Sequence, residues 1–216
     1  MTVHLHLMDR GQKLSDSNRE KLIRPVRSAL SVLQKFAPEL DADLVVVPTD
    51  IYCDPHWYRS GKAFGPGFAQ VEVNTDHPRF ARAWEEEGEA IVLHELHHCL
   101  RWAHISGPWT IGEIVVLEGL AIMAEGFGSS SRTNYGAPPS DAQLDMLCDR
   151  AWEEREQCES EATGWFRSID VKADTFTSPV NYFIGQVMME RALDRLGLDP
   201  FEAAMLQTSV LLEAAR

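Results

Sequence analysis

The residues with the clearest chemical potential form one short cluster, His94-Glu-Leu-His-His98. It matches the pattern H-E-x-x-H, in which two histidines lie four positions apart and a glutamate follows the first. On a helix, positions four apart lie about 40° from each other around the axis, so His94 and His98 can direct both imidazoles at one metal ion. Glu95 would stand beside that ion as a general base. The cluster therefore predicts a Zn2+ site with hydrolytic chemistry.

A catalytic zinc needs a third protein ligand and one open position. His104 has the spacing of the metzincin pattern, but Arg101 stands where that pattern has the glycine that lets the chain leave the helix. If the helix continues, His104 lies about 240° around the axis from His98 and points away from the metal. Glu118 lies in a second apolar helix after a Gly-Pro turn, so it can pack antiparallel to the first helix and reach the metal. We expect Glu118 to be the third ligand.

Three further side chains have roles that the pattern leaves open. His97 could replace His98, but only the outer pair of histidines flanks the glutamate, so we interpret His97 as a packing residue or as a partner of a ligand. Glu125, two helical turns after Glu118, either hydrogen-bonds a ligand histidine or faces solvent. Tyr182 is the candidate hydrogen-bond donor to a developing oxyanion, and the alternative for it is an ordinary amphipathic tyrosine.

Together these residues resemble the gluzincin branch of zinc peptidases, and most closely the YjaZ-like family of predicted Zn-dependent proteases, with H-E-x-x-H and E-G-x-A. The resemblance rests on His94-Glu-x-x-His98 and, 19 residues later, Glu118-Gly-Leu-Ala. It covers mainly residues 90–125, and more loosely residues 182–185. It implies a zincin-like fold in which an extended substrate pairs with the edge strand before the active-site helix, a place that residues 70–74 would take. Thermolysin-like gluzincins support a zinc histidine with an Asp after the ligand Glu, and residues 119–122 contain none.

The elements that must position these residues are strands first and helices after. Alternating or continuous apolar residues predict strands at Thr2–Met8, Leu44–Val47 and Phe68–Asn74, the second of them central, and Gly61–Gly67 predicts a turn. Helical spacing predicts helices at Ser15–Phe36 (bent or shortened at Pro25), Pro78–Ala103 (with a possible break near Gly88), Thr110–Ala124, Asp141–Phe166, Pro179–Leu196 and Pro200–Ala214. We therefore predict one zincin-like α+β domain over residues 1–216, with a small N-terminal mixed sheet, an active-site helix and a mainly helical C-terminal half.

Composition limits the classes of partner. With 44% hydrophobic and 25% charged residues among 216, the chain is globular, and no apolar run approaches the roughly 20 residues of a membrane span. A formal charge of -13 repels phosphate backbones, so neither nucleic acid nor membrane is an expected partner. The N-terminus lacks the pattern of a secretory signal, which predicts a cytoplasmic location. The cysteines show no CxxC spacing and predict isolated thiols.

These observations predict a cytoplasmic zinc metallopeptidase that hydrolyses peptide bonds in a peptide or protein substrate, with a metal-activated water and Glu95 as the general base. A histidine-rich helix without metal would leave imidazoles and a carboxylate among apolar neighbours, which costs free energy. Two alternatives stay open. A zincin-like metal-binding or regulatory module would keep the ion without turnover, and an amidohydrolase would use the same residues on a small non-peptide amide.

Overall fold

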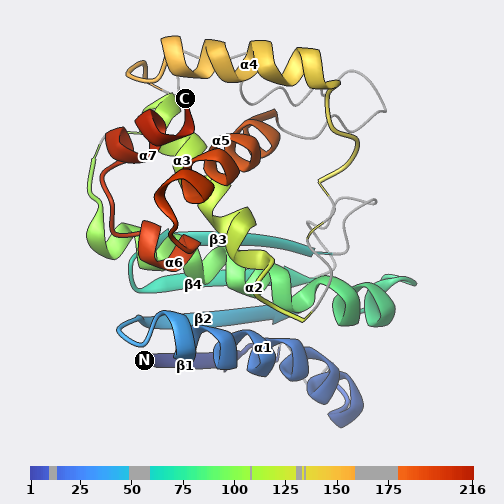
Figure 1. The fold of residues 1–216 in the computed structure, drawn as a ribbon. Helices are drawn as coiled ribbons and strands as arrows, with labels where there is room; N and C mark the ends of the chain where they lie inside the picture. The colour runs from blue at the N-terminus through green and yellow to red at the C-terminus, as the bar shows by residue number, and fades with distance from the viewer. Residues whose placement is uncertain (10–13, 49–58, 108, 130–132, 134, 159–179) are drawn as a thin grey trace. The chain divides into compact units, whose positions relative to one another are not determined.

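The computed structural model describes residues 1–9, 14–48, 59–107, 109–129, 133, 135–158 and 180–216 (Figure 1). The chain divides into two compact units. The first unit comprises Met1–His104 and Ala124–Thr133, and the second comprises Ile105–Met123 and Asn134–Arg216. The predicted α+β class is confirmed, since a small mixed sheet is followed by mostly helical structure. The single domain over residues 1–216 stays a prediction.

The first unit is built on a four-stranded sheet in the order β1-β2-β4-β3. The strands are β1 (Thr2–Leu7), β2 (Asp41–Pro48), β3 (Arg59–Gly65) and β4 (Phe68–Val73). β2 runs parallel to both β1 and β4, and β3 pairs antiparallel with β4. In this register Leu44 pairs with Leu5 on one side and with Ala69 on the other. The three predicted strands and the central place of β2 are therefore confirmed.

Two sequence predictions about this sheet are wrong, and both concern β3. The segment Gly61–Gly67, predicted as a turn, is the last five residues of β3 followed by a short turn into β4. The edge place given to residues 70–74 belongs to β3 instead, because β4 lies between β2 and β3. Glycines and a lysine in β3 replace the apolar alternation by which a strand is recognised, so the sequence hid the strand.

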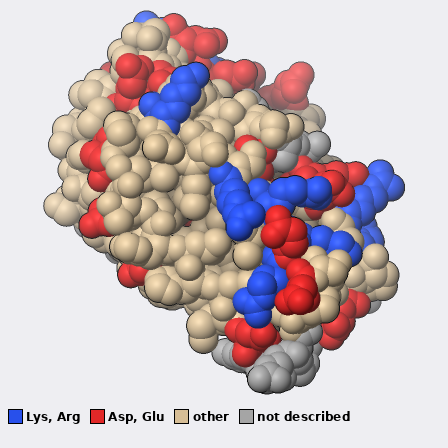
Figure 2. Space-filling view, turned by 90° about the horizontal axis from the view of Figure 1, so that it is seen from below, with Lys and Arg blue, Asp and Glu red and all other residues tan. Residues whose placement is uncertain are grey.

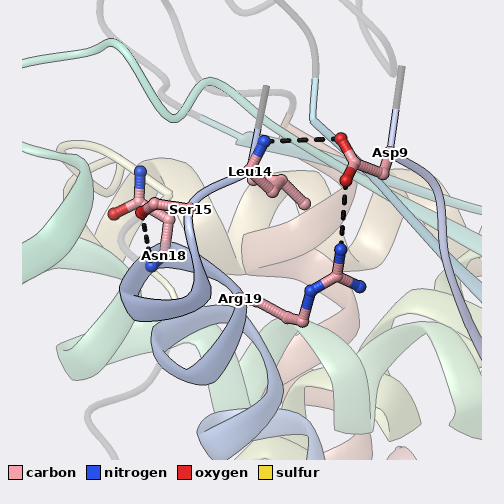
Figure 3. Close-up of polar contacts among 5 residues, drawn as sticks. All are labelled: Asp9, Leu14, Ser15, Asn18 and Arg19. Carbon is pink, nitrogen blue, oxygen red and sulfur yellow. Dashed lines mark hydrogen bonds and ion pairs between the residues drawn. The ribbon is translucent and has the colours of Figure 1, made fainter. Parts of the chain in front are cut away.

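α1 (Asp16–Phe36) joins the parallel neighbours β1 and β2 and therefore crosses one face of the sheet. The hydroxyl oxygen of Ser15 caps the helix by accepting a hydrogen bond from the N–H of Asn18 at 3.2 Å. The carboxylate of Asp9 accepts from the N–H of Leu14 at 3.3 Å and from the guanidinium of Arg19 at 3.0 Å (Figure 3). One side chain thus ties the end of β1 to the start of the helix.

α2 (Phe80–His104) packs against α1 and contacts β3 and β4. It runs unbroken through Gly88, where an added Cβ would lie 2.8 Å from Trp84 Cδ2 and 3.1 Å from Pro25 Cβ. α1 continues past Pro25 to Phe36. The shortening predicted at Pro25 and the possible break near Gly88 are therefore wrong: both helices continue, and the missing Cβ of Gly88 leaves room for Pro25 of α1.

Charged side chains of both signs intermingle on the side of the molecule shown in Figure 2. Within the first unit, Arg24 of α1 pairs with Glu85 of α2 at 2.5 Å, and Arg27 pairs with Glu20 at 3.4 Å. The negative net charge is thus not gathered into one surface of a single sign on that side. No helix in the described part of the chain is both long and apolar enough to cross a membrane.

The second unit is helical and has an apolar core of its own. Its helices are α3 (Ile111–Glu125, whose last residues belong to the first unit), α4 (Asp141–Glu153), α5 (Val180–Leu196), α6 (Pro200–Ala203) and α7 (Thr208–Ala215). Fully buried residues of this core include Ile111, Val115, Leu120, Ile184, Met189 and Leu211. α5 ends at Leu196 as predicted, and Gly197 follows in a left-handed conformation at φ +68°.

Two helices of the second unit are shorter than predicted. The helix predicted over residues 141–166 ends at Glu153, and residues 159–166 lie outside the described part of the chain. The chain turns back after Glu153 because the carbonyls of Arg155 and Gln157 accept hydrogen bonds at 2.9 and 3.0 Å from the first N–H groups of α3. The helix predicted over residues 200–214 is divided into α6 and α7.

Candidate metal centre

The second half of α2 buries polar side chains within an apolar helix. His94, Glu95 and His98 are 4%, 6% and 6% exposed. Their neighbours in the helix, from Ala90 to Leu93 and again at Leu96, are almost completely buried. Burying imidazoles and a carboxylate costs free energy unless each has a partner, so the partners indicate what this part of the helix is for.

The two outer histidines lie together, as the spacing predicts. The ring centroids of His94 and His98 are 4.6 Å apart and the rings are nearly perpendicular, at 84°. The Nδ1 atom of His94 lies 2.9 Å from Oε1 of Glu125, whose side chain is fully buried. When Glu125 is ionised it can only accept a hydrogen bond, which places the proton of a neutral His94 on Nδ1 and makes Nε2 the ring nitrogen whose lone pair a metal ion would need. This arrangement fits the requirements of a metal-binding histidine.

Glu125 is itself held in place. Its second carboxylate oxygen, Oε2, accepts a hydrogen bond from the backbone N–H of Thr133 at 2.8 Å. Of the two roles that the sequence left open for Glu125, the structure therefore supports contact with a predicted ligand histidine rather than exposure to solvent. The carboxylate that supports a histidine is thus present in this chain, although residues 119–122 contain none.

Glu95 lies against the edge strand. A Cβ atom added to Gly61 of β3 would lie 2.7 Å from Cδ and 2.8 Å from Cγ of Glu95, which is closer than real Cβ contacts come. Only a glycine lets this strand pass over the glutamate without displacing it. This role of Gly61 is not visible in the sequence, because the glycines and the proline around it predict a turn.

The remaining histidines of α2 have different surroundings. His97 is fully buried, whereas His104 is exposed. α2 continues through Arg101 and Trp102 to His104, so the chain does not leave the helix as the metzincin arrangement requires. The ring of His98 stacks over Trp102, with 6.0 Å between centroids.

Cys99 follows His98 but offers no thiolate at neutral pH. Burial, with a smaller contribution from the nearby Glu95 carboxylate, raises the pKa of its thiol to about 12. Cys99 therefore remains a protonated and apolar side chain, in agreement with the isolated thiols that the sequence predicts.

The other two predicted site residues, Glu118 and Tyr182, belong to the second unit. Glu118 is half-buried on α3, and the ring of Tyr182 near the start of α5 packs on Tyr135 with 4.4 Å between centroids. Gly119, directly after Glu118, lies against Gly185 of α5. A Cβ atom there would lie 2.6 Å from Met189 Cγ and would overlap the backbone of Gly185. The glycine of the E-G pair therefore has a packing role.

Comparison with known proteins finds a family model that includes the predicted metal-binding motif. Residues 75–166 match the model of a family described as "Predicted Zn-dependent protease (DUF2268)". The match covers the segment that carries both motifs and confirms the resemblance to the YjaZ-like proteases. No curated protein and no solved structure matches the chain.

Proposed function

We propose that this protein is a zinc metallopeptidase with a zincin-like fold that hydrolyses peptide bonds in a peptide or protein substrate. The observation that carries the proposal is the pair formed by His94 and Glu125, next to His98 on the same buried helix. A carboxylate that fixes the tautomer of a histidine is the usual companion of a metal ligand. The family description agrees with zinc and with proteolysis.

Glu118 is the proposed third ligand. It precedes Glu125 on α3 by seven positions, which correspond to about 700° of helical rotation, so both carboxylates leave the helix on the same side. Glu125 contacts His94 from that side. A half-buried carboxylate on a helix that is otherwise largely apolar is also the type of donor that completes a site with two histidines.

Zinc, when bound, would act as a Lewis acid that polarises the scissile carbonyl and lowers the pKa of a water molecule, so that this water can lose a proton and attack near neutral pH. Glu95 is placed next to His94 in the sequence and would accept the proton of the attacking water and then transfer it to the leaving amine. Tyr182 is the proposed donor to the oxyanion. It lies one helical turn before Gly185, the residue that meets Gly119 beside Glu118, so Tyr182 and Glu118 flank the same helix crossing.

The edge strand β3 is the proposed place for an extended substrate. The backbone of Gly61 passes directly over Glu95, so a peptide that pairs with β3 would run alongside the general base. This replaces the expectation for residues 70–74, because β4, which contains residues 70–73, lies between β2 and β3. The predicted cytoplasmic location stays a prediction.

The test is zinc content combined with hydrolysis of an unfolded protein by purified wild type and by Glu95→Gln. We expect about one zinc per chain in both proteins, and hydrolysis lowered by about 10²- to 10⁴-fold in the variant, because only the general base is lost. Glu86→Gln, an exposed glutamate of the same helix, is the matched control and should behave like wild type.

Wild type that is free of zinc after a zinc-replete preparation would overturn the proposal. Zinc that is retained without cleavage of a broad peptide library, with Glu95→Gln indistinguishable from wild type, would favour the regulatory module instead. Cleavage of small amides alone would favour the amidohydrolase.

A further inference from the structure

A second buried carboxylate, Glu89, lies on α2 before the histidine cluster and belongs to none of the roles described above. Its side chain is enclosed, with the residue 3% exposed. Oε1 accepts a hydrogen bond from the hydroxyl of Ser28 on α1 at 2.7 Å. Oε2 accepts from both the N–H and the hydroxyl of Ser129, at 3.0 and 2.8 Å. Glu89 therefore joins α2 both to α1 and to the segment that follows α3.

The last residue of α3 and the segment after it, Glu125–Ser129, are called the strap here, and all of it belongs to the first unit. Gly128 lies against α2, since a Cβ atom there would lie 2.9 Å from Cδ of Glu89 and 3.1 Å from Cδ1 of Leu93. Phe127 packs edge-to-face on Phe36 at the end of α1, with 5.0 Å between centroids. The strap is thus fixed at several points just after Glu125.

The first residue of the strap is the partner of His94, and the last residue is the partner of Glu89. Inside the strap, the N–H of Gly128 donates to the carbonyl of Glu125 at 3.3 Å. An apolar contact alone would let the strap slide, whereas two donors of Ser129 on one carboxylate oxygen fix its register. Glu89 thus holds one end of the strap, and Glu125 lies at the other end.

We infer that Glu89 is a positioning residue for the metal centre: through the strap it holds Glu125 where it keeps the proton of His94 on Nδ1 and leaves Nε2 to the metal. This inference rests on the proposed function only for the identity of the ligand. Replacing the direct partner of a metal-binding histidine weakens metal binding by about 10- to 100-fold, and Glu89 acts one step further away, so we expect a loss of about 3- to 10-fold.

The test uses Glu89→Gln, which keeps the size of the side chain but cannot accept hydrogen bonds on both sides. Two properties are measured: the tautomer of His94 in the metal-free, 15N-histidine-labelled protein at alkaline pH by NMR, and the affinity for Zn2+ by competition with a chelator. We expect a single Nδ1–H tautomer in wild type, a mixture of tautomers in Glu89→Gln, and a 3- to 10-fold weaker affinity for Zn2+.

Ser28→Ala is the matched control, because it removes the hydrogen bond to the same carboxylate from α1 and leaves the strap intact. It should change neither the tautomer nor the affinity by more than about twofold. If Glu89→Gln lowers thermal stability but leaves the tautomer and the affinity unchanged, the inference is overturned. An equal effect of Ser28→Ala would overturn it as well, since the strap would then not be the route.

Ser129→Ala keeps the test decisive if Glu89→Gln does not fold. It removes only the hydroxyl donor of the strap, and it should shift the tautomer of His94 in the same direction by a smaller amount; no shift would overturn the inference. The NMR measurement needs no metal. Failure of the wild type to bind zinc would therefore overturn the proposed function. The tautomer of His94 would still decide whether Glu89 positions Glu125.

Discussion

Two glycines of this protein each allow a close approach, but what they approach is different. Gly61 of β3, in the first unit, faces the end of the Glu95 side chain, whereas Gly119 of α3, in the second unit, faces the backbone of Gly185 on α5. A side chain can move aside at little cost to the fold, while two packed helix backbones cannot. A close approach to a carboxylate therefore indicates a functional constraint, and one to a backbone indicates a packing constraint.

The surroundings of the two glycines follow the same division. α2, below Gly61, buries histidines and glutamates that need hydrogen-bond partners, among them His94 and Glu89. α3, around Gly119, buries mostly isoleucine, valine and leucine in the core of the second unit. We therefore expect substitutions around Gly61 to change hydrolysis or zinc binding, and substitutions around Gly119 to change the free energy of unfolding.

The largest effect is expected for Gly61→Ala. The new methyl group overlaps the side chain of Glu95 and must displace its carboxylate. Because a misplaced general base is less effective, kcat/KM should fall by about 10²-fold. Thermal stability and zinc content should stay near those of wild type. Gly67→Ala is the control, because a Cβ atom there has nothing within 4 Å. If Gly61→Ala unfolds the protein but the folded fraction is fully active, the close approach at Gly61 is a packing constraint and not a functional one.

Gly119→Ala should act on stability instead. The added methyl group overlaps the backbone of Gly185, so α3 and α5 must separate, at about 1–3 kcal/mol of the free energy of unfolding. Chemical denaturation monitored by circular dichroism measures this loss. Gly107→Ala, where an added Cβ has nothing within 4 Å, should be neutral. An unchanged midpoint for Gly119→Ala would show that the helix crossing is not tightly packed.

Glu125→Gln tests whether the first unit affects the affinity for Zn2+. The amide still reaches Nδ1 of His94 but no longer carries the charge that favours a proton there, so the affinity for Zn2+ should fall by about 10-fold. Chelator competition measures the change, and Glu87→Gln on α2 serves as the control. Equal affinities of Glu125→Gln and wild type would remove Glu125 from the metal centre.

The smallest effect is expected for His104→Ala. This histidine is exposed at the end of an uninterrupted α2, so zinc affinity should stay within about twofold of wild type. Glu118→Gln, compared in the same titration, should weaken binding far more, because it is the proposed third ligand. The reverse order of these two variants would return His104 to the ligand set.

Local spacing was sufficient to predict α2 and the shared direction of His94 and His98, because helical periodicity relates residues four positions apart without any knowledge of the rest of the chain. It also predicted the helix that carries Glu118 and the helix that ends at Gly197. Contacts between distant residues were beyond it. Pro25 and Gly88 are an example, since residue type predicts a bent or shortened helix at the first and a possible break at the second, whereas both helices continue through the place where these two residues meet.

The sequence by itself predicted the kind of site, because a single helix is enough to bring the side chains of H-E-x-x-H to one side. Tertiary structure decided which carboxylate supports His94, which strand passes over Glu95, and that Glu89 is enclosed between α1 and the strap. The physical reason is that hydrogen bonds and close packing depend on distances in space between residues that can be more than 30 positions apart, as His94 and Glu125 are. Periodicity along the chain carries no information about such distances.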